Sequence, residues 1–151
     1  MFEASSIQLL ISVQTAITAI MLVYIAYKQW RLAENKLKLD LFEKRYKVFE
    51  ATRKFLSVIL REATFQNTDL FEFYAGTADA AFLFKDDIIS FLDSIRDHAL
   101  KMRAYARQYS NLPVGDERTQ LIKGESAELN GLTEQLRNLA TKFQPYLGFT
   151  K

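Results

Sequence analysis

The hydrophobic pattern of the chain starts with an uncharged run of 24 residues, from Ala4 to Tyr27. At a helical rise of about 1.5 Å per residue this run is long enough to cross a hydrocarbon core of about 30 Å. A cleaved signal peptide fits less well, because such a peptide has a basic start and a small-residue cleavage site. Here the chain starts with the acidic Met1-Phe2-Glu3, and the apolar run ends in bulky residues. A buried core helix of a soluble protein rarely runs this far without a charge. Residues 1–27 are therefore predicted to be a transmembrane anchor.

The charges on either side of the run predict its direction. Glu3 precedes it, whereas Lys28, Arg31, Lys36 and Lys38 follow it closely. Basic flanks stay in the cytoplasm, so we expect the N-terminus on the outer side of the membrane and the remaining chain in the cytoplasm. Aromatic rings and basic groups at the inner boundary favour the lipid headgroup layer, although the charges could serve as a topology signal alone. These interfacial residues are Tyr24, Tyr27, Lys28, Trp30 and Arg31.

Polar and small residues also follow a helical spacing inside the apolar run. The positions lie 4, 3, 4, 3 and 4 residues apart, and five of the six are polar or small; we call them the seam: Gln8, Ser12, Thr15, Ala19, Leu22 and Ala26. Membrane helices associate through close packing of small residues and through interhelical hydrogen bonds, so the seam predicts self-association. The alternative is a single, mildly polar anchor, because Ser and Thr can bond to their own backbone and Gln8 lies near the interface. Gln14 and Thr18 lie off the seam.

The next part of the chain has the composition of a long helix. No Gly or Pro occurs before Gly76, and residues 28–66 are rich in good helix formers. This predicts an amphipathic helix continuous with the span, about 60 residues and on the order of 90 Å in all. Its apolar stripe comprises Trp30, Ala33, Leu37, Leu41, Val48, Phe55, Ile59 and Ala63.

Three more helical segments are predicted after residue 66. A short one covers residues 69–84 with a break at Gly76, and longer ones cover residues 86–110 and 117–143, the last ended by Pro145. Apolar residues three and four apart in both longer helices predict antiparallel packing on the long helix. The expected fold is all-α: an N-terminal transmembrane helix that continues into a long amphipathic helix, and a cytoplasmic three- to four-helix antiparallel bundle in residues 28–151.

Three short motifs resemble those of a known group of sequences. They are Leu39-Asp-Leu-Phe-Glu-Lys-Arg45, Phe82-Leu-Phe84 and Phe143-Gln-Pro-Tyr-Leu147. Together with the N-terminal span they resemble small, uncharacterised bacterial membrane-anchored proteins. The resemblance implies the helical, membrane-anchored fold, a bacterial origin and a location in the bacterial inner membrane. It implies no activity and no active-site residue.

Composition and candidate chemistry argue against catalysis. The chain has no cysteine, which excludes disulfides and thiolate sites, and its net charge of +2 gives no support to nucleic-acid binding. His98 is the single histidine, and Asp93 and Asp97 lack a helical His partner for a metal. A basic strip, Arg96 to Arg107, is interrupted by those two aspartates. We therefore expect that the protein is not an enzyme and that it binds no cofactor, metal or nucleic acid. No small-molecule substrate is identified.

Aromatic residues are concentrated between residues 65 and 91, and most should fill the core. Phe71, Phe73 and Tyr74 cannot all point inward from a short helix, so they are the predicted surface for a protein partner. The expected function is a self-associating scaffold or interaction subunit in contact with membrane lipid. The alternative is an oligomeric membrane effector or pore, gated by the bundle, with the seam lining a polar path.

Overall fold

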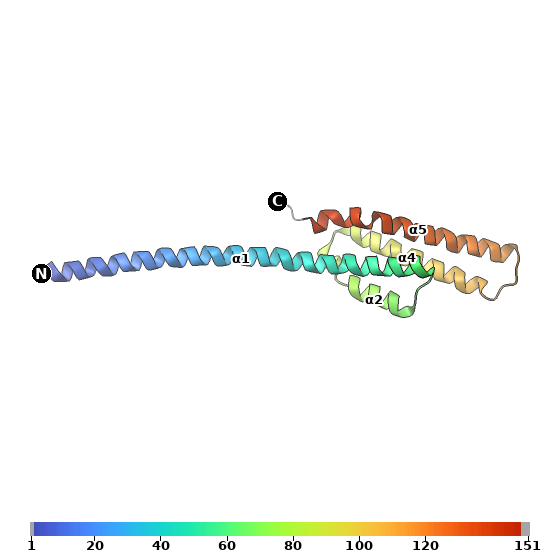
Figure 1. Cartoon of the computed structure of the whole chain (residues 1–151), viewed down its shortest axis with the longest axis horizontal. Helices are drawn as coiled ribbons and strands as arrows, with labels where there is room; N and C mark the ends of the chain where they lie inside the picture. Colours follow the sequence, from blue (N-terminus) through green and yellow to red (C-terminus); the bar gives the residue numbers. More distant parts are fainter. Residues whose placement is uncertain (1, 149–151) are drawn as a thin grey trace. The chain divides into compact units, whose positions relative to one another are not determined.

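A computed structural model describes the backbone of residues 2–148, and the side chains of residue 8 and residues 11–148. This part of the chain contains helices and no strand, which confirms the all-α class (Figure 1). The elements are α1 (Phe2–Glu62), α2 (Asn67–Thr77), α3 (Ala80–Leu83), α4 (Asp86–Tyr109) and α5 (Asp116–Leu147).

The chain divides into two compact units, residues 1–40 and residues 41–151. The first unit consists of the N-terminal part of α1, and each side chain described in it is exposed. In the described part of the chain, α1 is the one helix long and apolar enough to cross a membrane, and none of its most apolar window is buried by the chain itself.

The second unit, residues 41–151, is a bundle of helices. The part of α1 from Leu41 onward packs with α2, α4 and α5 around one core (Figure 1). Helices α4 and α5 are antiparallel, because Asp87 bonds to Tyr146 near one end and Tyr109 bonds to Glu125 near the other. The largest fully buried side chains of this core, which include one threonine, are Val48, Thr52, Leu56, Ile59, Ile88, Ile95, Leu132, Leu139 and Phe143.

Helix α1 ends at Glu62, four residues before the predicted end at residue 66. Ala63 takes a left-handed conformation, with φ at 52°, which reverses the chain as a helix C-terminal cap does. The reversal returns the Phe65 ring to the core, where it packs edge-on against Phe55 at 5.3 Å between ring centroids. Burial of Phe65 therefore sets the end of α1, and helix propensity alone did not predict it.

The break predicted at Gly76 lies slightly further along the chain, because α2 runs through Gly76 to Thr77 and α3 begins at Ala80. A Cβ atom built on Gly76 would lie 2.5 Å from the Cβ of Ala51 on α1. The glycine therefore allows two helix backbones to approach closely, and it does not serve as a helix breaker.

Gly124 and Gly131 of α5 have a related role. A Cβ atom at Gly124 would meet the Tyr105 ring at 2.9 Å, and one at Gly131 would meet the His98 ring at 2.9 Å. Each glycine thus makes room for a ring from α4, which offsets the helix propensity that glycine loses.

The prediction that Pro145 ends the last helix is wrong, because α5 continues to Leu147. Proline removes one backbone donor, but contacts of the following residues hold the final turn. Arg45 donates to the Tyr146 carbonyl, and Tyr146 and Leu147 pack against the core. Tertiary contacts thus compensate for the lost helical hydrogen bond.

Candidate functional site

All five seam residues named as association sites, Gln8, Ser12, Thr15, Ala19 and Ala26, are exposed. The Thr15 hydroxyl donates to the carbonyl of Ile11 at 2.7 Å, and Thr18 bonds in the same way to Gln14 at 2.8 Å. These hydroxyl donors are satisfied within their own helix, as the single-anchor alternative assumed. Any association through Thr15 must therefore use its small size, and does not require its donor.

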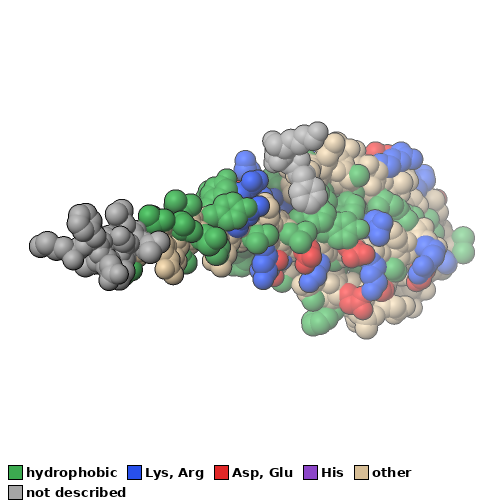
Figure 2. Space-filling view, turned by 60° about the vertical axis from the view of Figure 1, so that its left-hand side comes forward, with side chains coloured by type: hydrophobic (Ala, Val, Ile, Leu, Met, Phe, Trp, Pro, Cys, Tyr) green, Lys and Arg blue, Asp and Glu red, His purple; other side chains and the backbone are tan. Residues whose placement is uncertain are grey.

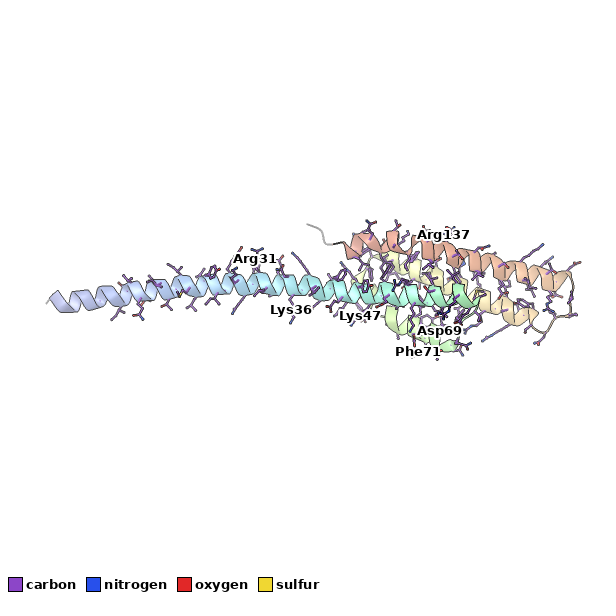
Figure 3. The ribbon with its side chains drawn as sticks, in the orientation of Figure 1. Arg31, Lys36, Lys47, Asp69, Phe71 and Arg137 are labelled. Carbon is purple, nitrogen blue, oxygen red and sulfur yellow. The ribbon has the colours of Figure 1, made fainter. Side chains whose placement is uncertain are left out.

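The predicted interfacial residues are also exposed, and they form a short aromatic and basic band. The Lys28 ammonium lies 5.7 Å from the Tyr24 ring centroid, and the Tyr27 and Trp30 rings are 6.4 Å apart. Figure 2 shows hydrophobic side chains along α1 before the first Lys and Arg side chains, and Figure 3 shows Arg31 projecting from the helix. Aromatic rings next to basic side chains, at the end of an apolar segment, are typical of the lipid headgroup layer.

The three motifs of the resemblance meet at one place in the bundle, which we call the Arg45 junction: Arg45, Leu83, Asp87 and Tyr146. Arg45 donates through Nε to the Leu83 carbonyl at 3.1 Å and through Nη1 to the Tyr146 carbonyl at 3.2 Å. The Tyr146 hydroxyl donates to Asp87 Oδ1 at 2.6 Å. One guanidinium therefore ties α1 to the end of α3 and to the last turn of α5.

The hydrogen bond between Tyr146 and Asp87 changes the pKa of both side chains. The Tyr146 hydroxyl holds the pKa of Asp87 below its usual value, and backbone N–H groups at the start of α4 add to the effect. The same bond raises the pKa of Tyr146. The carboxylate is thus stabilised in its charged form and the phenol in its neutral form.

An aromatic cluster centred on Phe143 supports the junction. Its ring centroid lies 5.5 Å from Phe49, 5.2 Å from Phe84 and 6.5 Å from Phe91, all in edge-on arrangements. Phe143 is fully buried. The motif residues that meet here are occupied in packing and hydrogen bonding with one another, so their role is to hold the bundle together.

His98 belongs to a second interhelical contact. Its Nδ1 lies 2.6 Å from Glu128 Oε2, and its ring covers Gly131. No group of three or more residues of the metal-ligating types lies together within the described chain. The geometry explains His98 as a contact between α4 and α5.

The basic strip of α4 is not a uniform cationic surface. The Arg103 guanidinium lies 3.8 Å from the Phe65 ring centroid and donates to the Asn67 side chain at 2.7 Å and to the Phe65 carbonyl at 3.0 Å. Burial lowers the pKa of Arg103. Arg96 pairs with Asp93 at 2.9 Å. These cations stabilise the turn after α1 and the surface of α4.

The predicted partner surface requires a correction at Phe73. This ring is 2% exposed and stacks on Phe55 at 4.7 Å, so it belongs to the core. Phe71 is 73% exposed and Tyr74 is partly exposed, and both lie on α2, where Figure 3 labels Phe71. Phe82 of α3 is 88% exposed and was not predicted as a surface residue, because its Phe-Leu-Phe context is typical of a core segment.

No protein-family model, curated protein or solved structure matches the chain.

Proposed function

We propose that the protein is a single-pass inner-membrane subunit that tethers a cytoplasmic helical bundle and associates with further copies of itself. The observation that carries the proposal is the long apolar part of α1, which no other element of the chain covers. Exposed apolar area costs about 25 cal/mol per Å² in water, so a helix with this surface requires lipid around it.

The charges support the orientation in which the bundle is cytoplasmic. Lys28 and Arg31 are exposed directly after the apolar segment, next to the rings of Tyr24 and Trp30. Basic residues near the end of a span are retained on the cytoplasmic side. In this orientation the same band contacts anionic headgroups, at about 1 kcal/mol for each well-placed cation.

Self-association through the seam is proposed on grounds of size. Ala19, Ala26 and the compact Thr15 allow two helix backbones to approach, and close packing is the main attraction between helices in lipid. The exposed Phe71 and Tyr74 on α2 then remain available for a protein partner that the assembly would recruit.

The size of the side chain at residue 15 provides the test. Thr15→Leu adds bulk to the seam, whereas Thr15→Val keeps the shape and removes the hydroxyl. We expect Thr15→Leu, alone or with Ser12→Leu, to shift the detergent-solubilised protein toward monomer in analytical ultracentrifugation, and Thr15→Val to behave like the wild type. An unchanged mass for the leucine variants would reject the role of the seam.

A polar pathway through an oligomer is the second candidate function, favoured by exposed Gln8 on the seam. It is weaker because the Thr15 hydroxyl already donates within its own helix. Expression of the intact protein should leave the membrane potential unchanged if it is a tether, and should dissipate the potential if it forms a pore.

A further inference from the structure

The buried face of α1 has a spacing that continues upstream of the bundle. Within the bundle, Val48, Thr52, Phe55 and Ile59 are buried, and they are 4, 3 and 4 residues apart. The same spacing leads back to a set of exposed residues that we call the stalk stripe: Trp30, Ala33, Leu37 and Leu41.

The stalk stripe lies on one face of its helix. Its members are 3, 4 and 4 residues apart, close to the helical period of 3.6. The seam residues Ala26, Leu22 and Ala19 precede it at spacings of 4, 4 and 3 residues. A single stripe of small or apolar positions therefore extends from the proposed span toward the bundle.

Leu37 lies beyond the proposed span and is left uncovered by the chain itself, whereas Leu41 is covered in part. Leu37 is 69% exposed, and Trp30, at the start of the stripe, is 64% exposed. Leu37 and Leu41 follow the boundary residue Tyr27 by 10 and 14 residues, which corresponds to about 15–21 Å of helix. Full burial of a leucine is worth about 1.5–3 kcal/mol, so the stripe favours a partner outside the headgroup layer.

We propose that the stalk stripe packs against the same stripe of a second copy, with the two helices parallel. The inference rests on the proposed membrane anchor, because two anchored copies of the same topology present identical residues at the same depth. The stripe also continues directly from the seam, so one helix pair extends both contacts and needs no additional element.

The charges beside the stripe do not oppose this pairing. Glu34 and Lys38 form an ion pair at 2.8 Å along one side, and Lys36 and Asp40 lie toward the other, while Lys44 lies on the line of the stripe, three residues after Leu41. Both signs are present on each side, so two copies do not meet as surfaces of one charge. Two alternatives compete with this pairing. A different protein could cover the stalk stripe, or two copies could pair through the opposite face, which carries Leu32 and Leu39.

The absence of cysteine makes a direct test straightforward, since any single cysteine introduced into the full-length chain is unique. We expect Ala33→Cys and Leu37→Cys to form disulfide dimers in membranes treated with a mild oxidant, several-fold more than Asn35→Cys and Leu39→Cys. The last two are matched controls in the same segment on the opposite side of the helix. Ala19→Cys reports separately on the seam.

The outcomes separate the two proposals. Dimers at Ala19 with none at Ala33 and Leu37 would overturn the stalk contact and leave association through the span intact. No dimer at any of the three positions would overturn both contacts. Equal dimer yields at Ala33, Asn35, Leu37 and Leu39, or higher yields at Asn35 and Leu39, would also overturn the stalk contact, because they indicate random collision or pairing through the other face.

Discussion

Replacing Gly76 by alanine tests the packing of α2 against α1. Two opposing effects decide the result. Alanine is favoured over glycine by about 1 kcal/mol inside a helix. Its methyl group, however, would lie 2.5 Å from the Cβ of Ala51, where about 3.5–4.0 Å is an ordinary carbon contact.

The clash should win, because the obstructing atom is fixed to the backbone of α1 and cannot rotate away. Relief requires the helices to separate by about 1 Å, and overpacking of this kind costs about 1–3 kcal/mol. After the gain in helix propensity is subtracted, we expect Gly76→Ala to destabilise the bundle by about 1 kcal/mol. At about 4–8 °C per kcal/mol for a small domain, the melting temperature should fall by several degrees.

The assay is thermal unfolding of the full-length protein in mild detergent, followed by circular dichroism. The double variant Gly76→Ala/Ala51→Gly moves the methyl group to the other helix, so its melting temperature should be higher than that of Gly76→Ala alone. A Gly76→Ala variant as stable as the wild type, or no recovery in the double variant, would contradict a clash between α2 and α1.

Three further substitutions test the turn and the Arg45 junction. Ala63→Gly should stabilise the bundle by about 0.5–1 kcal/mol in urea unfolding, because glycine adopts φ of 52° without the cost that alanine incurs; an equal or lower midpoint would contradict this. Arg45→Lys should cost about 1–3 kcal/mol, since one ammonium cannot donate to both carbonyls that the guanidinium contacts; Lys47→Arg, on the exposed surface of the same helix, is the control. The lowered pKa of Asp87 means that its bond to Tyr146 contributes stability above the unfolded pKa, near 3.8, and that this contribution is lost as the pH falls through the folded pKa. A Tyr146→Phe variant should therefore lose less stability than the wild type between pH 5 and about pH 2, measured by thermal melts, and identical acid profiles would argue against the bond.

Local patterns were sufficient to predict the class and order of the helices. Three- and four-residue spacing marked the buried face of α4, where Ile88, Ile95, Ala99 and Met102 are all in the core. Helix ends were predicted less well. The low helix propensities of Pro145 and Gly76 favour breaks, but contacts with residues distant in sequence outweigh them.

The Arg45 junction could not be predicted from one sequence. Its residues come from α1, α3, α4 and α5, and the contact depends on which helix ends meet in space. The motifs alone marked Arg45 and Tyr146 as notable without giving a reason. Similarly, Phe71 and Phe73 have the same local composition, and only the packing on Phe55 separates the buried ring from the exposed one.

Partition of the untagged chain between membrane and soluble fractions, after an alkaline carbonate wash, shows whether α1 crosses a bilayer. If α1 crosses the bilayer, the protein should remain in the membrane pellet, because the wash releases peripheral proteins and leaves spanning helices in lipid. Recovery of the chain in the supernatant would contradict a membrane span, since something other than lipid would then have to cover the exposed apolar part of α1.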